Sequence, residues 1–255
     1  MRLQDKVTII TGAGRGIGRG CAQAFARESA FVVVADLDET MAQECAEAIV
    51  ADGGTAVFHP VDISNPDQVE GMVARAVAEF GRLDILVSNA GIGGRKFGDG
   101  PIHECTLEGW DTIMNVNLRG TFLACKYALP ELLKTKGNII TMASVLGLVG
   151  TQGLYDTHAY MTSKAAIIGL TRNIATYYAE DGVRANSIAP GLVDTIMAKR
   201  TQADPDLLAQ VGFWQPLGPV GEISDVAETA VFLASNDAKF ITGTTIPVDG
   251  GWSAQ

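Results

Sequence analysis

A tyrosine and a lysine stand four positions apart in the stretch YMTSK, at Tyr160 and Lys164. On a helix, side chains at positions i and i+4 lie on the same face, so both groups reach a single site. A free phenol has a pKa of about 10 and is a poor base at neutral pH. A nearby ammonium favours the phenolate and lowers that pKa toward the range useful for acid–base catalysis. The pair predicts proton transfer at Tyr160; the alternative is an exposed pair on an amphipathic helix.

The residues after the pair favour burial. Lys164 is followed by AAIIGL, which is almost entirely apolar. A buried lysine needs a polar partner. We therefore expect Lys164 to be held by another part of the site.

A glycine-rich segment, TGAGRGIG at 11–18, joins the first apolar run to the first helical segment. It lacks the literal GxGxxG pattern, but its glycines still permit a tight turn and a close approach to a pyrophosphate at a helix N-terminus. Asp36 ends the second apolar run, where a carboxylate accepts hydrogen bonds from an adenosine ribose. Together, the glycine-rich segment and Asp36 favour dinucleotide binding. The alternatives are that the glycines serve only the packing of strand against helix and that Asp36 is a turn residue. A P-loop is excluded, because Arg19 stands where that motif needs lysine.

Short apolar runs rich in β-branched residues alternate with segments of helical periodicity. The runs are apolar throughout, as expected of strands buried on both faces of a parallel sheet. The predicted strands are 7–11, 31–36, 55–62, 84–91, 138–144, 184–191 and 244–251. The predicted helices are 17–28, 39–51, 66–80, 110–135, 159–180 and 224–235. This alternation predicts one α/β domain over 1–255: a doubly wound, Rossmann-type fold with a mostly seven-stranded parallel sheet and helices on both faces.

Three irregular stretches, 92–104, 145–158 and 192–220, follow strand ends. Open α/β sheets bind ligands at that edge. We expect 192–220 to be an irregular substrate loop or lid.

The bulk composition excludes several classes of protein. The 19 basic residues against 29 acidic ones give a net charge of −10, which disfavours nucleic acid and anionic membranes as partners. The four cysteines are widely spaced, as expected of reduced thiols and not of a metal cage. The chain shows no signal-peptide pattern and no long apolar run, so we expect a cytoplasmic protein.

The order of the motifs resembles the short-chain dehydrogenase/reductase family. TGAGRGIG, SNAG (88–91), NVNLRG (115–120), Ser144, YMTSK and NSIAPG with VDT (186–195) follow one another as in that family. The resemblance extends to the closing TGTTIPVDGGW. It implies a metal-free, NAD(P)-dependent alcohol dehydrogenase or ketoreductase that moves a hydride between a substrate carbon and the nicotinamide.

The resemblance also implies roles for individual residues. Tyr160 is the general acid/base, and Lys164 binds the nicotinamide ribose and lowers the tyrosine pKa. Ser144 hydrogen-bonds the substrate oxygen, and Asn117 anchors a water that relays protons. Without the resemblance, Ser144 could equally be a strand-end cap, and Asn117 a hydrogen-bonding residue at a helix kink. The cofactor-binding residues, besides Tyr160 and Lys164, are Gly12, Arg15, Gly16, Ile17, Gly18, Asp36, Asp62, Ile63, Asn89, Ala90, Gly91, Pro190, Gly191, Val193 and Thr195.

The choice between the two cofactors depends on two charges. Asp36 followed by Leu37 is typical of NAD users in the family, whereas a basic residue in the glycine turn, here Arg15, is typical of NADP users. Like charges in close contact cost several kcal/mol, so Asp36 should exclude a 2′-phosphate. We expect NAD rather than NADP.

The substrate side is marked by a longer interval between Ser144 and Tyr160 than the family usually has. It places Tyr155, Asp156 and His158 near the pocket. Such polar groups suit a sugar-, polyol- or cyclic-alcohol-like substrate, or else face solvent or a second subunit. Phe213 and Trp214 are candidates for an apolar lid over the substrate or for a subunit contact.

The same features bear on three alternative functions and on the expected assembly. The main alternative is an NADPH-dependent 3-oxoacyl reductase acting on acyl-carrier-protein or CoA thioesters, whose acidic carrier suits a chain of charge −10 poorly. Two further classes, a dinucleotide sensor without turnover and a methyltransferase, do not explain why Ser144, Tyr160 and Lys164 are all present. The resemblance implies a homotetramer built through long helices and C-terminal segments.

Overall fold

The continuous apolar runs of the sequence form one parallel sheet, seven-stranded over the residues that the structure, a computed structural model, describes: 1–151, 153 and 155–255. Gln152 and Leu154, in the stretch 145–158, lie outside the described residues. The strands are β1 (Val7–Thr11), β2 (Phe31–Asp36), β3 (Thr55–Pro60), β4 (Ile85–Ser88), β5 (Asn138–Met142), β6 (Arg184–Pro190) and β7 (Thr245–Val248). Their order is β3-β2-β1-β4-β5-β6-β7, so the chain reverses direction across the sheet between β1 and β4, where such folds bind ligands.

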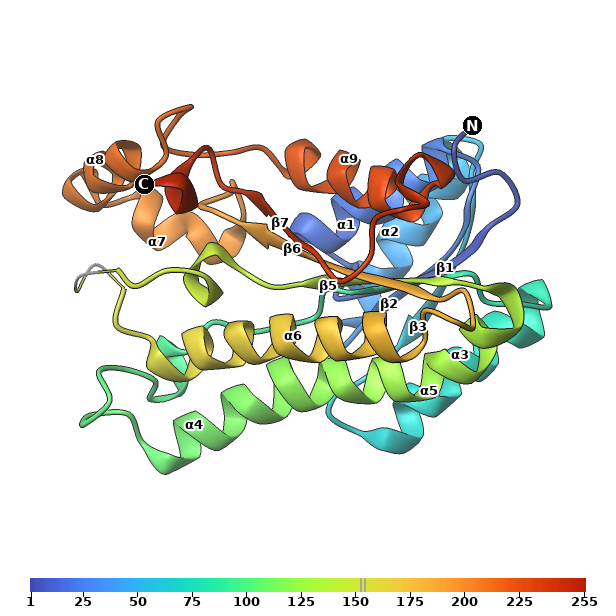
Figure 1. The fold of residues 1–255 in the computed structure, drawn as a ribbon, viewed down its shortest axis with the longest axis horizontal. Coiled ribbons are helices and arrows are strands. Elements are labelled where there is room, and N and C mark those ends of the chain that lie inside the picture. The colour runs from blue at the N-terminus through green and yellow to red at the C-terminus, as the bar shows by residue number, and fades with distance from the viewer. Residues whose placement is uncertain (152, 154) are drawn as a thin grey trace.

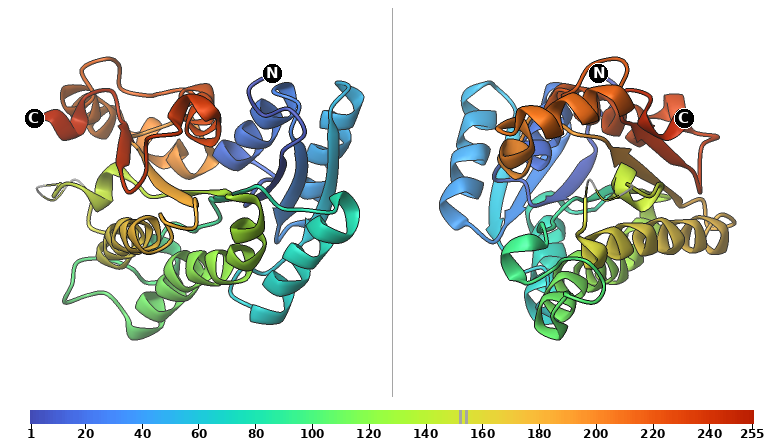
Figure 2. Two further views of the ribbon diagram at one scale, coloured as in Figure 1. Left: turned by 45° about the vertical axis from the view of Figure 1, so that its right-hand side comes forward. Right: turned by 90° about the vertical axis from the view of Figure 1, so that its left-hand side faces the viewer.

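Alternate side chains of each strand pack against two helical layers, because the side-chain period of a strand is two. Ile10 and Val34 point to one layer, and Ile9 and Val33 to the other. The first layer holds α1 (Gly16–Arg27), α2 (Glu39–Ala51) and α9 (Ile223–Ala234); the second holds α3 (Pro66–Phe80), α5 (Gly120–Thr135) and α6 (His158–Tyr177). Figures 1 and 2 show the sheet between these layers. The predicted doubly wound fold is confirmed.

Capping side chains set the helix starts. The predicted start at Asn65-Pro66 is correct: the Asn65 side chain accepts hydrogen bonds from the N–H groups of Asp67 and Gln68. The last long helix begins at Ile223, slightly earlier than predicted, because Glu222 and Asp225 form a reciprocal capping box.

The helix predicted over 110–135 consists of three segments. It begins earlier, at α4 (Leu107–Ile113), because the Thr106 hydroxyl caps the Gly109 N–H. A wide π-helical turn, η2 (Met114–Arg119), then joins α4 to α5. Such turns displace one residue from the regular helix surface and are frequent at functional sites; this one carries Asn117.

The stretch 192–220, expected to be an irregular substrate loop or lid, is partly helical; its role toward a substrate stays a prediction. It contains η4 (Ile196–Ala198), α7 (Lys199–Gln202) and α8 (Pro205–Trp214). Asp204 caps α8 through the N–H groups of Asp206 and Leu207, with Pro205 at the first helical position. Val211 buries this helix against Leu192 and Trp252. The other short turns are η1 (Arg95–Phe97), η3 (Val145–Gly147), η5 (Asn236–Ala238) and η6 (Trp252–Ala254).

All four cysteines are free, and Cys21, Cys45 and Cys125 are buried. Burial raises the pKa of Cys21 and of Cys125 to about 12, and that of Cys45 to about 11, so these thiols are unreactive at neutral pH. Within the described part of the chain, no helix has both the length and the apolar character needed to cross a bilayer.

Candidate active site

Helix α6 places Tyr160 and Lys164 together at the carboxyl end of β5. The Nζ atom of Lys164 lies 5.7 Å from the centroid of the Tyr160 ring. Lys164 is 4% exposed, and its ammonium donates a 2.7 Å hydrogen bond to the carbonyl oxygen of Met142, the last residue of β5. The partner expected for a buried lysine is therefore a strand-end carbonyl. The alternative, an exposed pair on an amphipathic helix, is wrong.

Burial is the largest cause of the pKa shifts of both groups. It lowers the pKa of Lys164 to about 8. It also raises the pKa of Tyr160 above its ordinary value; the hydrogen bond with Ser144 acts in the opposite direction, and the charge of Tyr155 adds to the increase. In the chain alone, then, the predicted lowering of the tyrosine pKa by Lys164 is not found. The physical reason is that an apolar site disfavours the charged forms of both groups.

Ser144 follows β5 directly and lies beside the phenol. Its hydroxyl lies near enough to the phenol to act against the rise in the Tyr160 pKa, and it accepts a bond of 3.2 Å from the Leu146 N–H. It is thus the cap of η3 as well as a neighbour of the phenol. The same oxygen therefore has a fixed position next to Tyr160.

Asn117, on the π turn, joins the loop after β4 to α6. Its Oδ1 accepts from the Ile92 N–H at 2.8 Å, while Nδ2 donates to the Ile92 carbonyl at 3.1 Å and to the Ser163 hydroxyl at 3.2 Å. The Ser163 hydroxyl in turn donates to the Tyr160 carbonyl at 2.7 Å. Ser163 is a site residue that the sequence reasoning missed, although it lies inside YMTSK.

The end of β4 approaches the same place. A Cβ on Gly91 would lie 3.2 Å from Oδ1 of Asn117 and 3.5 Å from Nζ of Lys164. Gly91 therefore borders the group that contains Lys164 and Asn117. Four predicted residues, Asn117, Ser144, Tyr160 and Lys164, are brought together.

The glycine turn after β1 is fixed by the end of β4. Asn89 donates from Nδ2 to the carbonyl oxygens of Thr11 and Gly12, at 2.9 and 3.1 Å. Gly12 has a φ of +64° and Gly16 one of +55°, which side chains disfavour. A Cβ on Gly18 would lie 2.1 Å from the Gly12 carbonyl oxygen, so α1 can pack this closely only with glycine at that position.

The start of α1 has the properties of an anion site. Within the described chain, its first turn carries no acidic residue, and the N-cap Arg15 makes no side-chain capping bond. The first N–H groups of a helix have no partner inside the helix and favour negative charge. The backbone of Gly16, Ile17 and Gly18 thus fits a pyrophosphate. Arg15 is exposed beside it.

Asp36 ends β2 next to this turn. Its Oδ2 accepts a 2.9 Å hydrogen bond from the Gly14 N–H, and its Oδ1 accepts from the Asp38 N–H at 3.0 Å. A Cβ on Gly14 would lie 3.1 Å from Asp36 Oδ2 and 2.8 Å from Met41 Cβ. The carboxylate is therefore held beside the glycine turn.

The segment after β3 holds Asp62 and Ile63, two of the predicted cofactor-binding residues. Asp62 Oδ1 accepts from the N–H and the hydroxyl of Ser64, at 2.9 and 2.7 Å. The Ile63 side chain is buried in the core, where a Cβ on Gly120 would lie 2.8 Å from its Cγ2. An adenine contact at Ile63 would therefore involve its backbone.

The segment after β6 turns back over the glycine turn. Pro190 ends β6, and the N–H of Gly191 donates to the Val248 carbonyl at 2.9 Å. Val193 pairs with Gly221 in a parallel bridge. The Gly221 N–H donates to the Leu192 carbonyl, and the Asp194 N–H donates to the Gly221 carbonyl. In such a bridge the N–H and C=O of Val193 point to the opposite side. Thr195 Cγ2 lies 3.6 Å from the position of a Cβ on Gly16.

On the substrate side, aromatic residues form a cluster. The ring centroids of Tyr155 and Trp252 are 6.1 Å apart, and those of Trp214 and Trp252 are 5.0 Å apart. The Tyr155 hydroxyl donates to Thr201 Oγ1 at 3.3 Å, which joins the long 145–158 stretch to α7. Trp252, near the C-terminus, was not predicted; its signal was the closing GGW.

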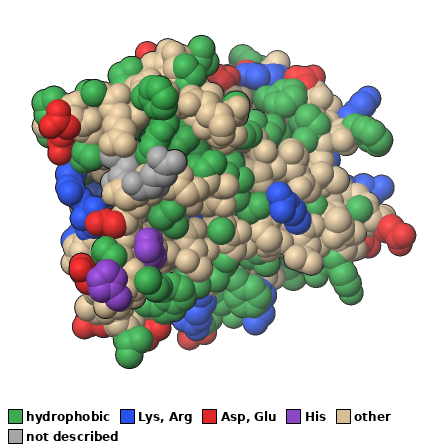
Figure 3. Space-filling view, turned by 60° about the vertical axis from the view of Figure 1, so that its left-hand side comes forward, with side chains coloured by type: hydrophobic (Ala, Val, Ile, Leu, Met, Phe, Trp, Pro, Cys, Tyr) green, Lys and Arg blue, Asp and Glu red, His purple; other side chains and the backbone are tan. Residues whose placement is uncertain are grey.

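The other substrate-side candidates are placed apart from this cluster. Asp156 forms an ion pair with Arg95, so its carboxylate is already engaged. His158 is half-buried at the first position of α6. Phe213 is 73% exposed, and Ile196, Met197 and Leu217 are also more than half exposed. Figure 3 shows hydrophobic side chains exposed among polar ones at this end of the molecule.

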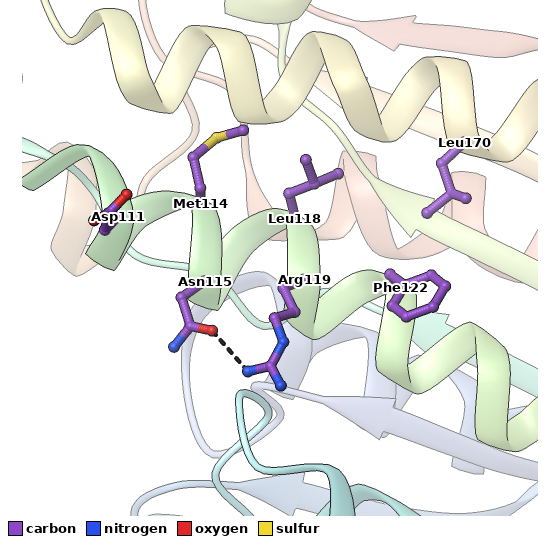
Figure 4. Close-up of a pocket in the computed structure, with 7 residues that line it drawn as sticks. All are labelled: Asp111, Met114, Asn115, Leu118, Arg119, Phe122 and Leu170. Carbon is purple, nitrogen blue, oxygen red and sulfur yellow. Dashed lines mark hydrogen bonds between the residues drawn. The ribbon is translucent and has the colours of Figure 1, made fainter. Parts of the chain in front are cut away.

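An apolar groove lies away from the site, over η2, α5 and α6 (Figure 4). It is lined by Asp111, Met114, Asn115, Leu118, Arg119, Phe122 and Leu170. Leu170 follows Tyr160 by ten residues on α6, which is about 15 Å along the helix. The α6 side of the groove is therefore well separated from Tyr160.

Comparisons with known proteins show which family and fold the chain resembles. A family profile described as Enoyl-(Acyl carrier protein) reductase matches residues 12–253. The 2,5-dichloro-2,5-cyclohexadiene-1,4-diol dehydrogenase LinX of Sphingobium indicum is 39% identical over 253 residues, 99% of this chain and 98% of the relative. The meso-2,3-butanediol dehydrogenase of Serratia marcescens is 39% identical over 257 residues, 100% of this chain and 97% of the relative. The crystal structure of gox2181 has a TM-score of 0.95 at 32% identity, covering 100% of this chain and 98% of that one.

Proposed function

The chain belongs to the short-chain dehydrogenase/reductase family, and we propose that it interconverts a secondary alcohol of a small diol or cyclic alcohol and the corresponding ketone, with NAD as cofactor. The observation that carries this proposal is the Tyr160 and Lys164 pair, in which the lysine is buried, with Ser144 near the phenol and the glycine turn nearby. An anion-binding helix start beside a buried acid–base pair suits alcohol oxidation with a dinucleotide.

The residues fit a nicotinamide dinucleotide by the chemistry of their donors and acceptors. The N–H groups at the start of α1 would bind the pyrophosphate, and Asp36 would accept the hydroxyls of the adenosine ribose. Lys164 would donate to the nicotinamide ribose, and the outward N–H and C=O of Val193 would bind the carboxamide. The bound dinucleotide supplies the two-electron acceptor, and its positive ring charge when oxidised favours the phenolate.

The chain's own residues move the proton. In the oxidation, Tyr160 as phenolate takes the proton of the substrate hydroxyl; in the reduction it returns that proton to the oxygen. The Ser144 hydroxyl holds the same oxygen beside the phenol. Lys164, 4% exposed and anchored on Met142, places a positive charge near the phenolate in surroundings of low dielectric constant. Asn117 fixes the loop of Ile92 against α6 and keeps this group together.

The NAD preference rests on Asp36. Its carboxylate lies at the end of β2 and is held by the Gly14 N–H, so it would face the adenosine ribose. A 2′-phosphate would bring a second negative charge against it, which costs several kcal/mol. Arg15 is exposed and makes no capping bond at α1, so it supplies less fixed charge than Asp36.

The substrate class rests on the aromatic cluster and on the relatives. Tyr155, Trp214 and Trp252 form a cluster of tilted aromatic rings whose one hydroxyl is bonded to Thr201, and we expect this cluster to suit a small ring or a short carbon chain bearing hydroxyl groups. Relatives with 39% identity are named for a cyclic diol and for a butanediol. The alternative, NADPH-dependent 3-oxoacyl reduction, fits Asp36 and the net charge of −10 less well.

The test is a panel assay. We would follow absorbance at 340 nm with NAD or NADP against vicinal diols, cyclohexanols, cyclohexanediols, polyols and 3-oxoacyl thioesters. Turnover of the diols or cyclic alcohols with NAD supports the proposal. Turnover of the thioesters alone, or a preference for NADP, contradicts it.

For assembly and location, we propose a cytoplasmic homotetramer. The groove with Met114, Leu118, Phe122 and Leu170 leaves apolar side chains open to solvent, which suits burial against a second copy. Four free cysteines suit a reducing compartment.

A further inference from the structure

We propose that Asp99 is a positioning residue for Tyr160. The inference rests on the proposed function and names a further residue on which that site depends. Asp99 lies in the loop between β4 and α4, more than fifty residues before α6 in the sequence. Its side chain is nevertheless in direct contact with the start of α6.

The carboxylate of Asp99 caps the helix that carries the acid–base pair. Its Oδ1 accepts from the Ala159 N–H at 2.9 Å, and its Oδ2 accepts from the Tyr160 N–H at 3.0 Å. These are the second and third positions of α6, whose N–H groups an N-cap side chain normally serves. The N-cap residue of this helix, Thr157, makes no such bond. A residue distant in sequence therefore performs the capping.

Because Asp99 is buried, its negative charge must be stabilised by the groups that it contacts. The residue is 6% exposed, and within the described part of the chain it forms no ion pair. Asp84, buried to a similar degree, has Lys6 and Arg82 as cationic partners. A buried carboxylate without a cation must be compensated by strong hydrogen bonds. The two N–H groups and the positive end of a 20-residue helix supply that compensation.

The loop is tied to the same helix start at two more points. Arg95 forms an ion pair with Asp156, and the His158 N–H donates to the Gly100 carbonyl at 3.3 Å. Gly94 makes room for the carboxylate, since a Cβ there would lie 2.0 Å from Asp99 Oδ2. The loop after β4 and the start of α6 therefore form one unit.

The consequence concerns the phenol. Holding the Tyr160 N–H fixes the backbone from which the side chain extends, relative to the end of β4 where the cofactor would bind. Misplacement of a catalytic group by about 1 Å costs on the order of 100-fold in rate. Loss of the Asp99 contact should therefore lower kcat, while the glycine turn, which is held by Asn89 and Asp36, still binds the dinucleotide.

The test compares Asp99→Ala, Asp99→Asn and Gly94→Ala, with Asp84→Asn as the control for loss of another buried carboxylate. We expect Asp99→Ala to lower kcat by about 10- to 100-fold and to leave the Kd of NAD within about twofold. Asp99→Asn keeps one acceptor oxygen and should recover part of kcat. Gly94→Ala should act in the same direction as Asp99→Ala. Asp84→Asn should lower the melting temperature and leave kcat close to that of wild type.

Amide hydrogen exchange provides a readout that does not need turnover. Asp99→Ala should speed exchange in a peptide covering 157–163 and leave exchange at 168–176 unchanged. If Asp99→Ala does not fold, Asp99→Asn and Gly94→Ala carry the same comparison. A kcat within about twofold of wild type overturns the proposal, and so does a parallel loss of kcat and NAD affinity. Wild-type protein that oxidises no alcohol refutes the proposed function instead, while the exchange data still decide the contact.

Discussion

The backbone N–H of Gly14 donates a 2.9 Å hydrogen bond to the carboxylate of Asp36, which joins the turn after β1 to the end of β2. This bond places a negative charge where a dinucleotide would present its adenosine ribose. We expect this carboxylate to weigh more than Arg15 in the choice between NAD and NADP.

Replacing that carboxylate should shift the cofactor preference. We expect Asp36→Ser to raise kcat/KM with NADP relative to NAD by about 10- to 100-fold, because like-charge contacts of several kcal/mol are removed. Steady-state assays with both cofactors measure the ratio. Asp38→Asn, which removes a neighbouring charge that caps α2, is the control and should leave the ratio unchanged. An unchanged ratio in Asp36→Ser would refute the role of Asp36.

Burial of Lys164 predicts a particular dependence of stability on pH. The pKa of Lys164 is about 8 in the folded chain against 10.5 as its ordinary value. Between these values the unfolded chain binds more protons, so the free energy of unfolding rises with pH in this window. The buried ammonium therefore destabilises the fold below about pH 8, by at most about 3 kcal/mol, and the cost is relieved toward pH 10.5.

Lys164→Met removes this dependence. The unfolding free energy of Lys164→Met minus that of wild type should fall between pH 8 and 10, whatever its value at pH 7. Urea unfolding at several pH values measures this difference. Lys199→Met, at an exposed position, is the control and should give a flat difference. A flat difference for Lys164→Met would mean that the lysine is not held in a desolvated site.

The glycine turn tolerates no side chain at Gly18. A Cβ there would meet the Gly12 carbonyl oxygen at 2.1 Å and Asn89 Nδ2 at 2.6 Å. Gly18→Ala should cost about 1–3 kcal/mol of unfolding free energy, as overpacking usually does, and weaken NAD binding. Gly71→Ala, in α3 with no atom within 4 Å of the new Cβ, should stabilise by about 0.5–1 kcal/mol. Thermal unfolding and NAD titration distinguish the two; equal melting temperatures would contradict the packing argument.

A negative charge introduced into the apolar groove beside α5 and α6 should change the assembly of the protein. Phe122 lines it and is 46% exposed. If two copies bury this ring, Phe122→Asp should convert tetramers into smaller species, because an unpaired charge in an apolar interface is costly. Light scattering after gel filtration measures the mass. Val50→Asp, at an exposed apolar position on α2, should leave the mass unchanged. Monomeric wild-type protein would refute the tetramer.

The sheet and most long helices could be predicted because their signals are local. The β-branched run at 31–36 and the cap at Asn65-Pro66 are contained within a few residues of sequence. The Tyr160 and Lys164 pair was readable for the same reason, since i and i+4 share a helix face. Helix α8 was missed although Asp204-Pro205 is the same kind of start signal; its position inside a glycine- and proline-rich stretch obscured it.

The features that could not be predicted depend on long-range contacts. Nothing near Asp99 indicates that it caps a helix starting at His158, because the contact exists only once the sheet has placed the loop after β4 beside α6. The pairing of Trp214 with Trp252 likewise requires the C-terminus to fold over α8. The pKa of Tyr160 depends on burial in the finished fold, so the spacing to Lys164 gave only one of the opposing effects.

The most direct test of the account is the turnover of Tyr160→Phe. The substitution removes the hydroxyl and keeps the ring, so the fold and NAD affinity should stay close to wild type. With a diol or cyclic alcohol that the wild type oxidises, we expect the rate of absorbance increase at 340 nm to fall by about 10²- to 10⁴-fold, the usual contribution of a general base. A rate within about tenfold of wild type, with NAD still bound, would contradict the assignment of proton transfer to Tyr160.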